Sequence, residues 1–463
     1  MSQTSRSLLV LAVALGGGLV VLANGAPATL ATATALLVFA IGFWALALLP
    51  EALTGLVFMV GAIVGGAAPP AAVLAGFTTG AFWLIFAGLL LGTAVSQTGL
   101  SNWLLYRALP ARIRDGAAVG YPTLVAVVVA FSGGLGLLLP ATSGRVVLLV
   151  PLILALAERV GFAAGSRGRT GLVVAGAVAT FVIPITILPA NLPNLVLAGS
   201  LEALYGVTLT YGAYIALHFP VIAVLKAIAL TAIVAVLFDD RPSPPHTATE
   251  ATPAPPLSEA ARRLGLVLAV TLVLWATDVI HGVAAAWVGM VAAIVCLLPA
   301  SRILPFKQLA SGPYLPLLLY VGAVLGVASL MTETGLGAAL GQQLIAVVPL
   351  GDASDFAILS WLAVLGAVSG LAATMPGAPA IAVPLFPEIA ALTGWSIEAI
   401  GMAQVLGYAT PLFPYQIPPF VVAMAMAGIP AAAFTRTLLW LAAVTTLPML
   451  GLGYLWWSLL GWL

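Results

Sequence analysis

Two short clusters of Pro, Gly and small polar residues interrupt long apolar stretches of this chain, about 233 residues apart. The first cluster is Ala141-Thr142-Ser143-Gly144-Arg145 and the second is Thr374-Met375-Pro376-Gly377-Ala378. A helix that breaks inside a membrane leaves free N–H groups, which attract an anion, and free carbonyl groups, which suit a cation. The two clusters therefore predict a binding site for a small anion together with one or two cations.

A second pair of interruptions follows in the same order, Asn191-Leu192-Pro193-Asn194 and Gln416-Ile417-Pro418-Pro419. Hydroxyl, amide and guanidinium groups at the interruptions are the candidate ligands. We expect the substrate to be bound by Thr142, Ser143, Arg145, Asn194, Thr374 and Gln416. We expect the cation to be bound by Ser143, Gly144, Asn191, Asn194, Pro376 and Gly377. The pattern predicts no catalytic residue and no resident metal.

Arg145 is followed by an apolar run, and an ionisable residue at membrane depth indicates a functional site. Its guanidinium could bind a carboxylate or sulfate through two parallel hydrogen bonds. It could instead place a permanent positive charge where a related carrier holds a cation, or extend to the cytoplasmic surface and cap a helix. Lys226 also lies in an apolar run, from which its side chain could extend to the membrane surface.

The composition is that of an all-α protein that crosses a membrane several times. Of the 463 residues, 62% are hydrophobic and 6% are charged, whereas soluble domains carry roughly 25% charged residues. A net charge of +1 gives no reason to expect a nucleic-acid partner. The single cysteine, Cys296, excludes a disulfide framework and a thiolate metal site. The three histidines are far apart and form no ligand spacing.

The elements that must position these residues form two halves, each with one copy of the landmarks. A Pro-rich stretch over residues 239–263 separates residues 1–238 from residues 264–463 and has the composition of a solvated cytoplasmic linker. Ser258 is positioned to cap the helix that follows. Each half is expected to contain a re-entrant helical hairpin and a broken span: about 119–160 and 171–200 in the first half, and about 354–393 and 396–430 in the second.

The basic residues predict the orientation of the two hairpins, because Lys and Arg favour the cytoplasmic side. Two arginine trios on either side of the first hairpin should face the cytoplasm: Arg107, Arg112 and Arg114, and Arg159, Arg167 and Arg169. The flanks of the second hairpin are acidic or uncharged, so it should enter from the outside. This arrangement predicts an inverted repeat of about 11 transmembrane helices. We expect an inner-membrane protein with a cytoplasmic N-terminus and an extracytoplasmic C-terminus.

At these residues the chain resembles the divalent anion/sodium symporter (DASS) family, over roughly residues 75–430. The family's Ser-Asn-Thr tip is similar to Ala141-Thr142-Ser143 before Pro151, and to Thr374-Met375-Pro376 before Pro384. Both tips lack the family's asparagine, and Arg145 is not part of its usual pattern. The resemblance implies an elevator-type carrier, with a scaffold that forms a homodimer and a transport domain that holds both hairpins.

The leading interpretation is a secondary active transporter of a small anion, such as a di- or tricarboxylate, sulfate or another oxyanion. Sodium is the expected coupling ion, with proton coupling or exchange as alternatives, and no other cofactor is expected. A membrane subunit of a binding-protein-dependent carrier and a cation/proton antiporter are the other candidates. The spans contain no paired carboxylates, HExxH or GxSxG motif, so an enzyme is not expected.

Overall fold

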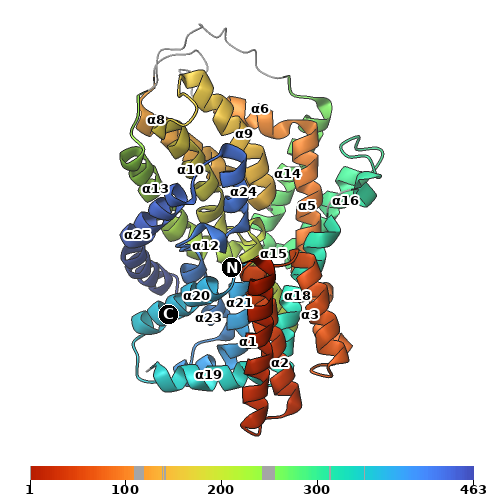
Figure 1. The fold of residues 1–463 in the computed structure, drawn as a ribbon. Coiled ribbons are helices and arrows are strands. Elements are labelled where there is room, and N and C mark those ends of the chain that lie inside the picture. The colour runs from red at the N-terminus through yellow and green to blue at the C-terminus, as the bar shows by residue number, and fades with distance from the viewer. Residues whose placement is uncertain are drawn as a thin grey trace.

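The computed structural model describes residues 2–108, 119–137, 139, 142–241, 256–311, 314–348 and 350–463, and it contains only helices and loops over these ranges (Figure 1). In this part of the chain, eight helices are long and apolar enough to cross a membrane, or nine if a bent pair is counted as one span. Five shorter apolar helices have 10–17 residues. The prediction of an all-α polytopic membrane protein is confirmed.

The helices of the first half precede the linker. They are α1 (Gln3–Ala23), α2 (Ala28–Ala45), α3 (Glu51–Val64), α4 (Pro70–Val73), α5 (Gly80–Thr98), α6 (Leu100–Ala108), α8 (Tyr121–Gly134), α9 (Thr142–Val160), α10 (Arg167–Val182), α11 (Leu192–Tyr205), α12 (Tyr211–His218) and α13 (Val224–Leu237).

The helices of the second half follow the linker. They are α14 (Glu259–Ala276), α15 (Asp278–His281), α16 (Ala285–Leu297), α17 (Gln308–Ser311), α18 (Tyr314–Glu333), α19 (Leu336–Val347), α20 (Asp355–Ala372), α21 (Gly377–Ala382), α22 (Phe386–Thr393), α23 (Ile397–Tyr408), α24 (Pro418–Ala427) and α25 (Ala431–Leu459).

Local sequence signals determine where several helices begin and end. The Ser258 hydroxyl accepts a hydrogen bond from the Ala261 N–H at 3.1 Å, so the predicted cap of α14 is confirmed. Gly99 and Gly335 follow α5 and α18 with φ values of +73° and +74°. A residue with a Cβ is strained in this left-handed conformation, which explains why glycine stands at both matched Thr-Gly-Leu sites.

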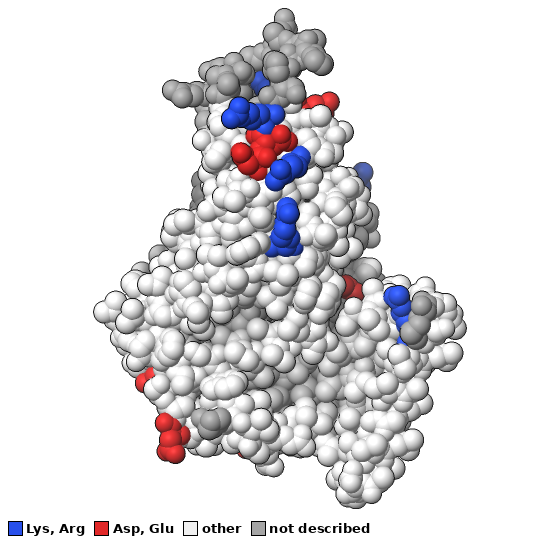
Figure 2. All heavy atoms as spheres, turned by 60° about the vertical axis from the view of Figure 1, so that its left-hand side comes forward, with Lys and Arg blue, Asp and Glu red and all other residues white. Residues whose placement is uncertain are grey.

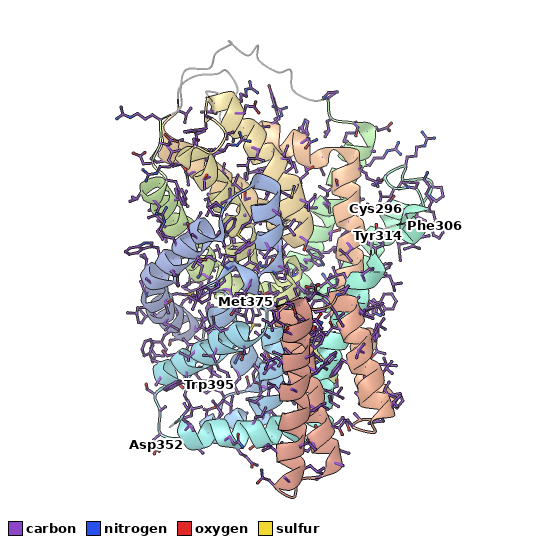
Figure 3. The ribbon with its side chains drawn as sticks, viewed as in Figure 1. Cys296, Phe306, Tyr314, Asp352, Met375 and Trp395 are labelled. Atoms are coloured by element: carbon purple, nitrogen blue, oxygen red, sulfur yellow. The ribbon has the colours of Figure 1, made fainter. Side chains whose placement is uncertain are left out.

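Both sequence clusters lie where a new helix begins. Helix α8 is followed by a 3₁₀ turn over Leu135–Leu137, and α9 begins at Thr142. Pro140 and Ala141 lie outside the described residues, as do Arg112, Arg114 and residues 242–255 of the linker. Helix α20 ends at Ala372, and α21 begins at Gly377. In Figure 1, α8 and α9 lie in the upper half of the molecule, α20 and α21 lie lower, and Figure 3 places Met375 near the centre.

Two helices are interrupted beside these clusters. Helix α10 ends at Val182, and two 3₁₀ turns lead to α11 at Leu192. Helix α23 ends at Tyr408, and α24 begins at Pro418 after a 3₁₀ turn over Pro414–Gln416. Helix α10 packs against α8 and α9, whereas α23 packs against α20. A Cβ on Gly407 would lie 2.7 Å from the Ala367 nitrogen, so this glycine is required for the close approach of α20 and α23.

Charged side chains are concentrated toward one end of the face shown in Figure 2. Most of the Lys and Arg visible on this face lie near its upper end, close to the segments that flank the linker. Acidic residues lie among them, and further acidic residues lie at the lower edge. Between them the visible surface is almost entirely uncharged. Such a surface suits contact with the lipid bilayer.

Candidate functional site

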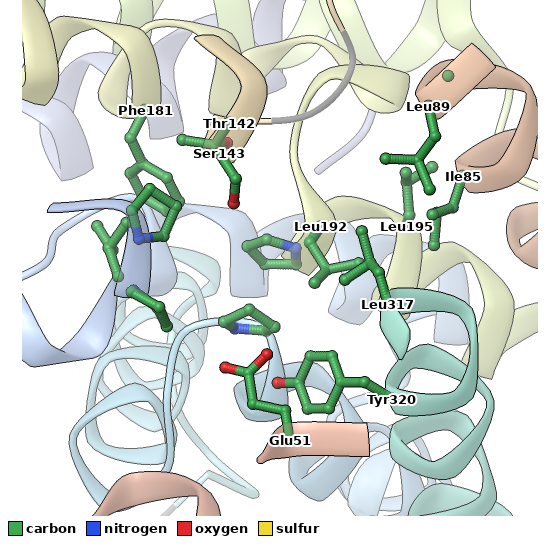
Figure 4. Close-up of a pocket in the computed structure, with 16 residues that line it drawn as sticks. Glu51, Ile85, Leu89, Thr142, Ser143, Phe181, Leu192, Leu195, Leu317 and Tyr320 are labelled. Carbon is green, nitrogen blue, oxygen red and sulfur yellow. The ribbon is translucent and has the colours of Figure 1, made fainter. Parts of the chain in front are cut away.

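A cavity lies where the first turns of three helices meet (Figure 4). Thr142 and Ser143 begin α9, Leu192 and Pro193 begin α11, and Pro418 and Pro419 begin α24; all six line the cavity, together with Pro376 of the second tip. The N-terminal end of a helix carries a partial positive charge. Three such ends around one cavity favour an anion within it.

The opposite wall of the cavity comes from other helices. Glu51 begins α3, and Tyr320 lies on α18. Figure 4 shows the Glu51 carboxylate and the Tyr320 hydroxyl side by side, across the cavity from Ser143. The rest of the lining is mainly apolar or aromatic: Ile85, Gly88, Leu89, Phe181, Leu195, Leu317 and Ile417. Among the described residues, the lining includes no Arg or Lys, and Glu51 is its only carboxylate.

Arg145 lies one helical turn after Thr142, behind the cavity wall, and its side chain is fully buried. Its Nε donates to the Thr180 hydroxyl at 2.9 Å. Nη1 donates to the backbone carbonyls of Ala190, at 2.8 Å, and Leu139. Nη2 lies within hydrogen-bond distance of the Thr180 carbonyl at 2.8 Å, Asn191 Oδ1 at 2.7 Å and the Thr142 hydroxyl at 3.1 Å. The guanidinium therefore joins the first tip to both sides of the broken span α10–α11.

Among the described residues, Arg145 has six acceptors, and all are neutral oxygens. Within the described ranges the structure shows one ion pair, between Arg263 and Glu259, far from this site in the chain. The charge of Arg145 is therefore compensated by dipoles and not by a carboxylate. A buried charge without a counterion is costly unless hydrogen bonds satisfy all of its donors, and this arrangement provides an acceptor for each.

The two asparagines of the first broken span have different roles. Asn191 Oδ1 accepts from the Thr142 hydroxyl at 2.6 Å and from Arg145, and its Nδ2 donates to the Phe181 carbonyl at 3.0 Å. Asn194 Nδ2 donates to the carbonyls of Ile185 and Ile187, each at 3.0 Å. Its Oδ1 is buried and has no hydrogen-bond partner among the described residues. Both side chains hold the non-helical backbone between α10 and α11.

Gln416 performs a similar task in the second half. Its Oε1 accepts from the backbone N–H groups of Leu412 and Phe413 at 2.7 and 2.9 Å, and its Nε2 donates to the Gly370 carbonyl at 2.9 Å. The Met375 N–H donates to the Gln416 carbonyl at 2.8 Å. The second tip is therefore joined to the second broken span by backbone and side-chain hydrogen bonds.

The residues predicted for the site thus occupy two layers. Thr142, Ser143 and Pro376 line the cavity. Arg145, Asn191 and Gln416 lie behind this lining and hold its backbone in place. The remaining predicted residues are not part of the lining: Gly144, Asn194, Thr374 and Gly377.

Sequence reasoning missed Glu51 and Tyr320. Glu51 follows Pro50 within an otherwise apolar stretch, and an acidic residue in that position is the signal that could have revealed it. Lys226 differs from expectation as well. Its side chain is fully buried instead of extending to the surface, and its Nζ donates to the Thr410 hydroxyl at 3.2 Å. Thr410 lies two residues after the end of α23, at the second broken span.

Comparison with known proteins agrees with this architecture. A membrane protein of Cupriavidus necator is 25% identical over 408 residues, which cover 84% of this chain and 77% of that protein. The YdaH transporter of Alcanivorax borkumensis has the same fold, with a TM-score of 0.56, 19% identity and coverage of 86% of this chain and 90% of that one. MtrF of Neisseria gonorrhoeae, described as illuminating a class of antimetabolite efflux pumps, gives a TM-score of 0.54 at 11% identity, with coverage of 83% and 81%.

The family assignment comes from a match that covers almost the whole chain. The sequence profile of the sodium:sulfate symporter transmembrane region matches residues 2–463. The predicted relationship to the divalent anion/sodium symporters is confirmed, and the family consists of transporters and not of enzymes. The chain belongs to the sodium:sulfate symporter family.

Proposed function

We propose that this protein transports a small anion, such as a di- or tricarboxylate, sulfate or a similar oxyanion. The observation that supports this best is the cavity where α9, α11 and α24 begin beside the hydroxyls of Thr142 and Ser143. Partial positive charges around one cavity, with a hydroxyl donor from Ser143, suit a carboxylate or an oxyanion. The family match supports the broader class, a secondary transporter of anions.

We propose an elevator mechanism, because the cavity has two walls of different origin. Both tips and both broken spans form one wall, and α3, α5 and α18 form the other. If the first group moves as a unit along the second, the bound anion is carried from one side of the membrane to the other. In this proposal α3, α5 and α18 belong to the scaffold, through which two copies form a homodimer in the inner membrane. The linker end shown at the top of Figure 2 faces the cytoplasm, because Lys and Arg are concentrated there.

Two energy sources are candidates. Sodium symport is supported by the description of the family. Exchange of one anion for another is favoured by Arg145, which supplies a permanent positive charge beside the cavity. In either case the purified chain is expected to transport without an extracytoplasmic binding protein.

The test is anion binding and uptake by the purified chain. Sulfate, succinate and citrate are screened for thermal stabilisation in sodium, potassium and choline, since a ligand of the native state raises its apparent stability. The anions that stabilise the protein are then followed as radiolabelled substrates in proteoliposomes. Ser143→Ala should weaken binding, whereas Ser360→Ala, on α20 outside the cavity lining, should not. If no anion stabilises the protein or enters the vesicles in any salt, the proposed function is wrong.

Uptake by the chain alone would also eliminate the binding-protein-dependent alternative. A cation/proton antiporter would instead show cation-driven proton movement in the same vesicles, without any added anion.

A further inference from the structure

The two broken spans share a feature that the family assignment does not predict, namely a buried basic residue at each break. Arg145 lies at the break between α10 and α11, and Lys226 contacts Thr410 at the break between α23 and α24. Both side chains are fully buried. Neither has a carboxylate within ion-pair distance among the described residues. Of the two, the Arg145 guanidinium is the permanent positive charge, and it lies in the part of the protein that carries both tips.

The oxygens around Arg145 are of the kind that would otherwise bind a sodium ion. They are the backbone carbonyls of Leu139, Thr180 and Ala190, the hydroxyls of Thr142 and Thr180, and Asn191 Oδ1. Breaks in α-helices leave such carbonyls free, and hard cations prefer oxygen ligands. In this chain the guanidinium already occupies the space between these oxygens. A sodium ion does not fit this set of ligands while Arg145 is in place.

We propose that Arg145 is a built-in cation that replaces a coupling sodium ion at the first broken span, so that the carrier exchanges anions instead of importing them with sodium. This inference rests on the proposed function, since it concerns the energy source of the same anion site. Arg145 is a positioning residue and not a direct ligand: it holds Thr142, which lines the cavity, and it contributes charge from behind the wall.

Anion exchange follows because the positive charge of Arg145 is covalently attached to the carrier. A bound sodium ion leaves its site after release of the anion, so a carrier that uses sodium returns without either. A guanidinium cannot leave, and the empty carrier would have to move with a net positive charge that no anion balances in a medium of low dielectric constant, which is costly. An anion in the cavity neutralises that charge. The loaded carrier therefore crosses readily in both directions, whereas the empty one does not.

Lys226 is a second buried basic side chain, at the other break. Among the described residues it forms one hydrogen bond, to Thr410, so it lacks the full set of acceptors that holds the guanidinium of Arg145. The built-in charge is therefore assigned to Arg145 alone.

The experiment measures uptake of radiolabelled sulfate and succinate into proteoliposomes that contain the full chain. One set of vesicles is loaded with the same unlabelled anion and the other with gluconate, in sodium or in choline. We expect uptake only into the anion-loaded vesicles, at rates that differ by less than about twofold between sodium and choline. Uptake that requires sodium and proceeds into gluconate-loaded vesicles would overturn the proposal.

Variants at Arg145 separate its charge from its structural contribution. Arg145→Gln removes the charge and opens the oxygen set, so exchange in choline should fall about tenfold or more, a loss of about 1.4 kcal/mol per factor of ten. The same variant should gain thermal stability on replacement of choline by sodium, whereas the wild type should not. Arg145→Lys, which retains the charge, should exchange faster than Arg145→Gln. Arg263→Gln, at an exposed ion pair, serves as the control.

The outcomes distinguish the two proposals. Absence of anion binding and uptake in every salt refutes the proposed function itself. Wild-type exchange by Arg145→Gln, or strict sodium dependence of the wild type, refutes only the built-in cation. If Arg145→Gln does not fold, the comparison of sodium with choline in the wild type still decides the question.

Discussion

Arg145 acts on the cavity through its neighbours, and Asn191 is one of these. Asn191 Oδ1 accepts from both the Arg145 guanidinium and the Thr142 hydroxyl, while Thr142 forms part of the cavity wall. The effect of the buried charge on a ligand can therefore be altered by a single atom at position 191. The same reasoning applies to Glu51 on the opposite wall, where a carboxylate faces the space that the anion is proposed to occupy.

Asn191→Asp should balance the charge of Arg145 with a side chain of nearly the same shape as asparagine. The new carboxylate would pair with the guanidinium at the position of an existing hydrogen bond, and such pairs can be accommodated inside a protein when all their donors are satisfied. We expect the folded protein to survive and the dissociation constant for sulfate or succinate to rise about tenfold. Isothermal titration calorimetry measures the change, and Asn24→Asp at the exposed end of α1 is the control. Unchanged affinity would show that the charge of Arg145 does not act on the anion.

Glu51→Gln should have the opposite effect. The carboxylate repels an anion across the cavity, and two like charges near a protein surface interact by about 1 kcal/mol or more at contact distances. Its removal should lower the dissociation constant about fivefold. Glu398→Gln, at the start of α23 and outside the lining, should change nothing in the same binding assay. Weaker binding by the Glu51 variant would mean that this carboxylate assists the ligand.

At the scale of the elements, each tip is joined to the broken span beside it by a different device. A guanidinium and an asparagine join the first tip to α10 and α11, and a glutamine with its own backbone carbonyl joins the second tip to the segment before α24. The matched positions thus carry unlike residues that perform the same task. Helix packing adds to this, because Gly407 allows α23 to approach α20 closely.

Gln416→Leu should destabilise the protein by roughly 1–2 kcal/mol, because the part-buried N–H groups of Leu412 and Phe413 lose their acceptor and an unsatisfied buried group costs about 1–3 kcal/mol. Thermal unfolding in detergent, followed by circular dichroism, measures the loss. Gln343→Leu, on the exposed side of α19, is the matched control. Equal unfolding temperatures for the two variants would contradict this role of Gln416.

Gly407→Ala should lower the free energy of unfolding by about 1–3 kcal/mol, the usual cost of adding atoms to a closely packed contact. The added Cβ would meet the backbone of α20 near Ala367, where no flexible side chain can move aside. Gly451→Ala on α25 has nothing within 4 Å of the new Cβ and should have little effect. The same unfolding experiment tests both variants. A neutral Gly407 variant would indicate that the two helices separate readily.

At the scale of the whole molecule, the cavity lies between two groups of helices, and transport is proposed to require that these groups move past each other. Leu192 on α11 and Leu317 on α18 lie on different groups and close together in the cavity wall (Figure 4). The only cysteine, Cys296, is buried on α16, so a background without cysteines requires one further substitution.

A covalent link between the two groups should stop transport. Cysteines at positions 192 and 317, in a Cys296→Ser background, are expected to crosslink with a short bifunctional reagent and to abolish anion exchange. A cleavable linker should allow reductant to restore it. The single-cysteine variants, treated in the same way, should continue to exchange. Transport at the normal rate by the crosslinked protein would exclude relative motion of α11 and α18.

Features that depend on neighbouring residues could be predicted from the sequence, whereas contacts between distant segments could not. Helix breaks at Pro and Gly, the cap at Ser258 and the apolar spans depend on neighbouring residues, and they could be predicted. The acceptors of Arg145 could not be predicted, because Thr180 on α10 and Ala190 in the turn before α11 approach it only in the folded chain. Lys226 was misjudged for the same reason, since Thr410 is 184 positions away. Glu51 could have been suspected from its charge, but not placed in the cavity.

The hydrogen bond from the Met375 N–H to the Gln416 carbonyl has a consequence for how the cavity opens. Carriers with re-entrant hairpins can in principle admit a ligand by swinging one hairpin outward as a gate. Here the second tip would have to break its bond to Gln416, and the first would have to withdraw the Arg145 guanidinium from its carbonyl and side-chain acceptors. Neither tip can therefore swing outward without breaking these hydrogen bonds. An inhibitor that prevents access should therefore be sought at the border with α3, α5 and α18, and not beneath a hairpin.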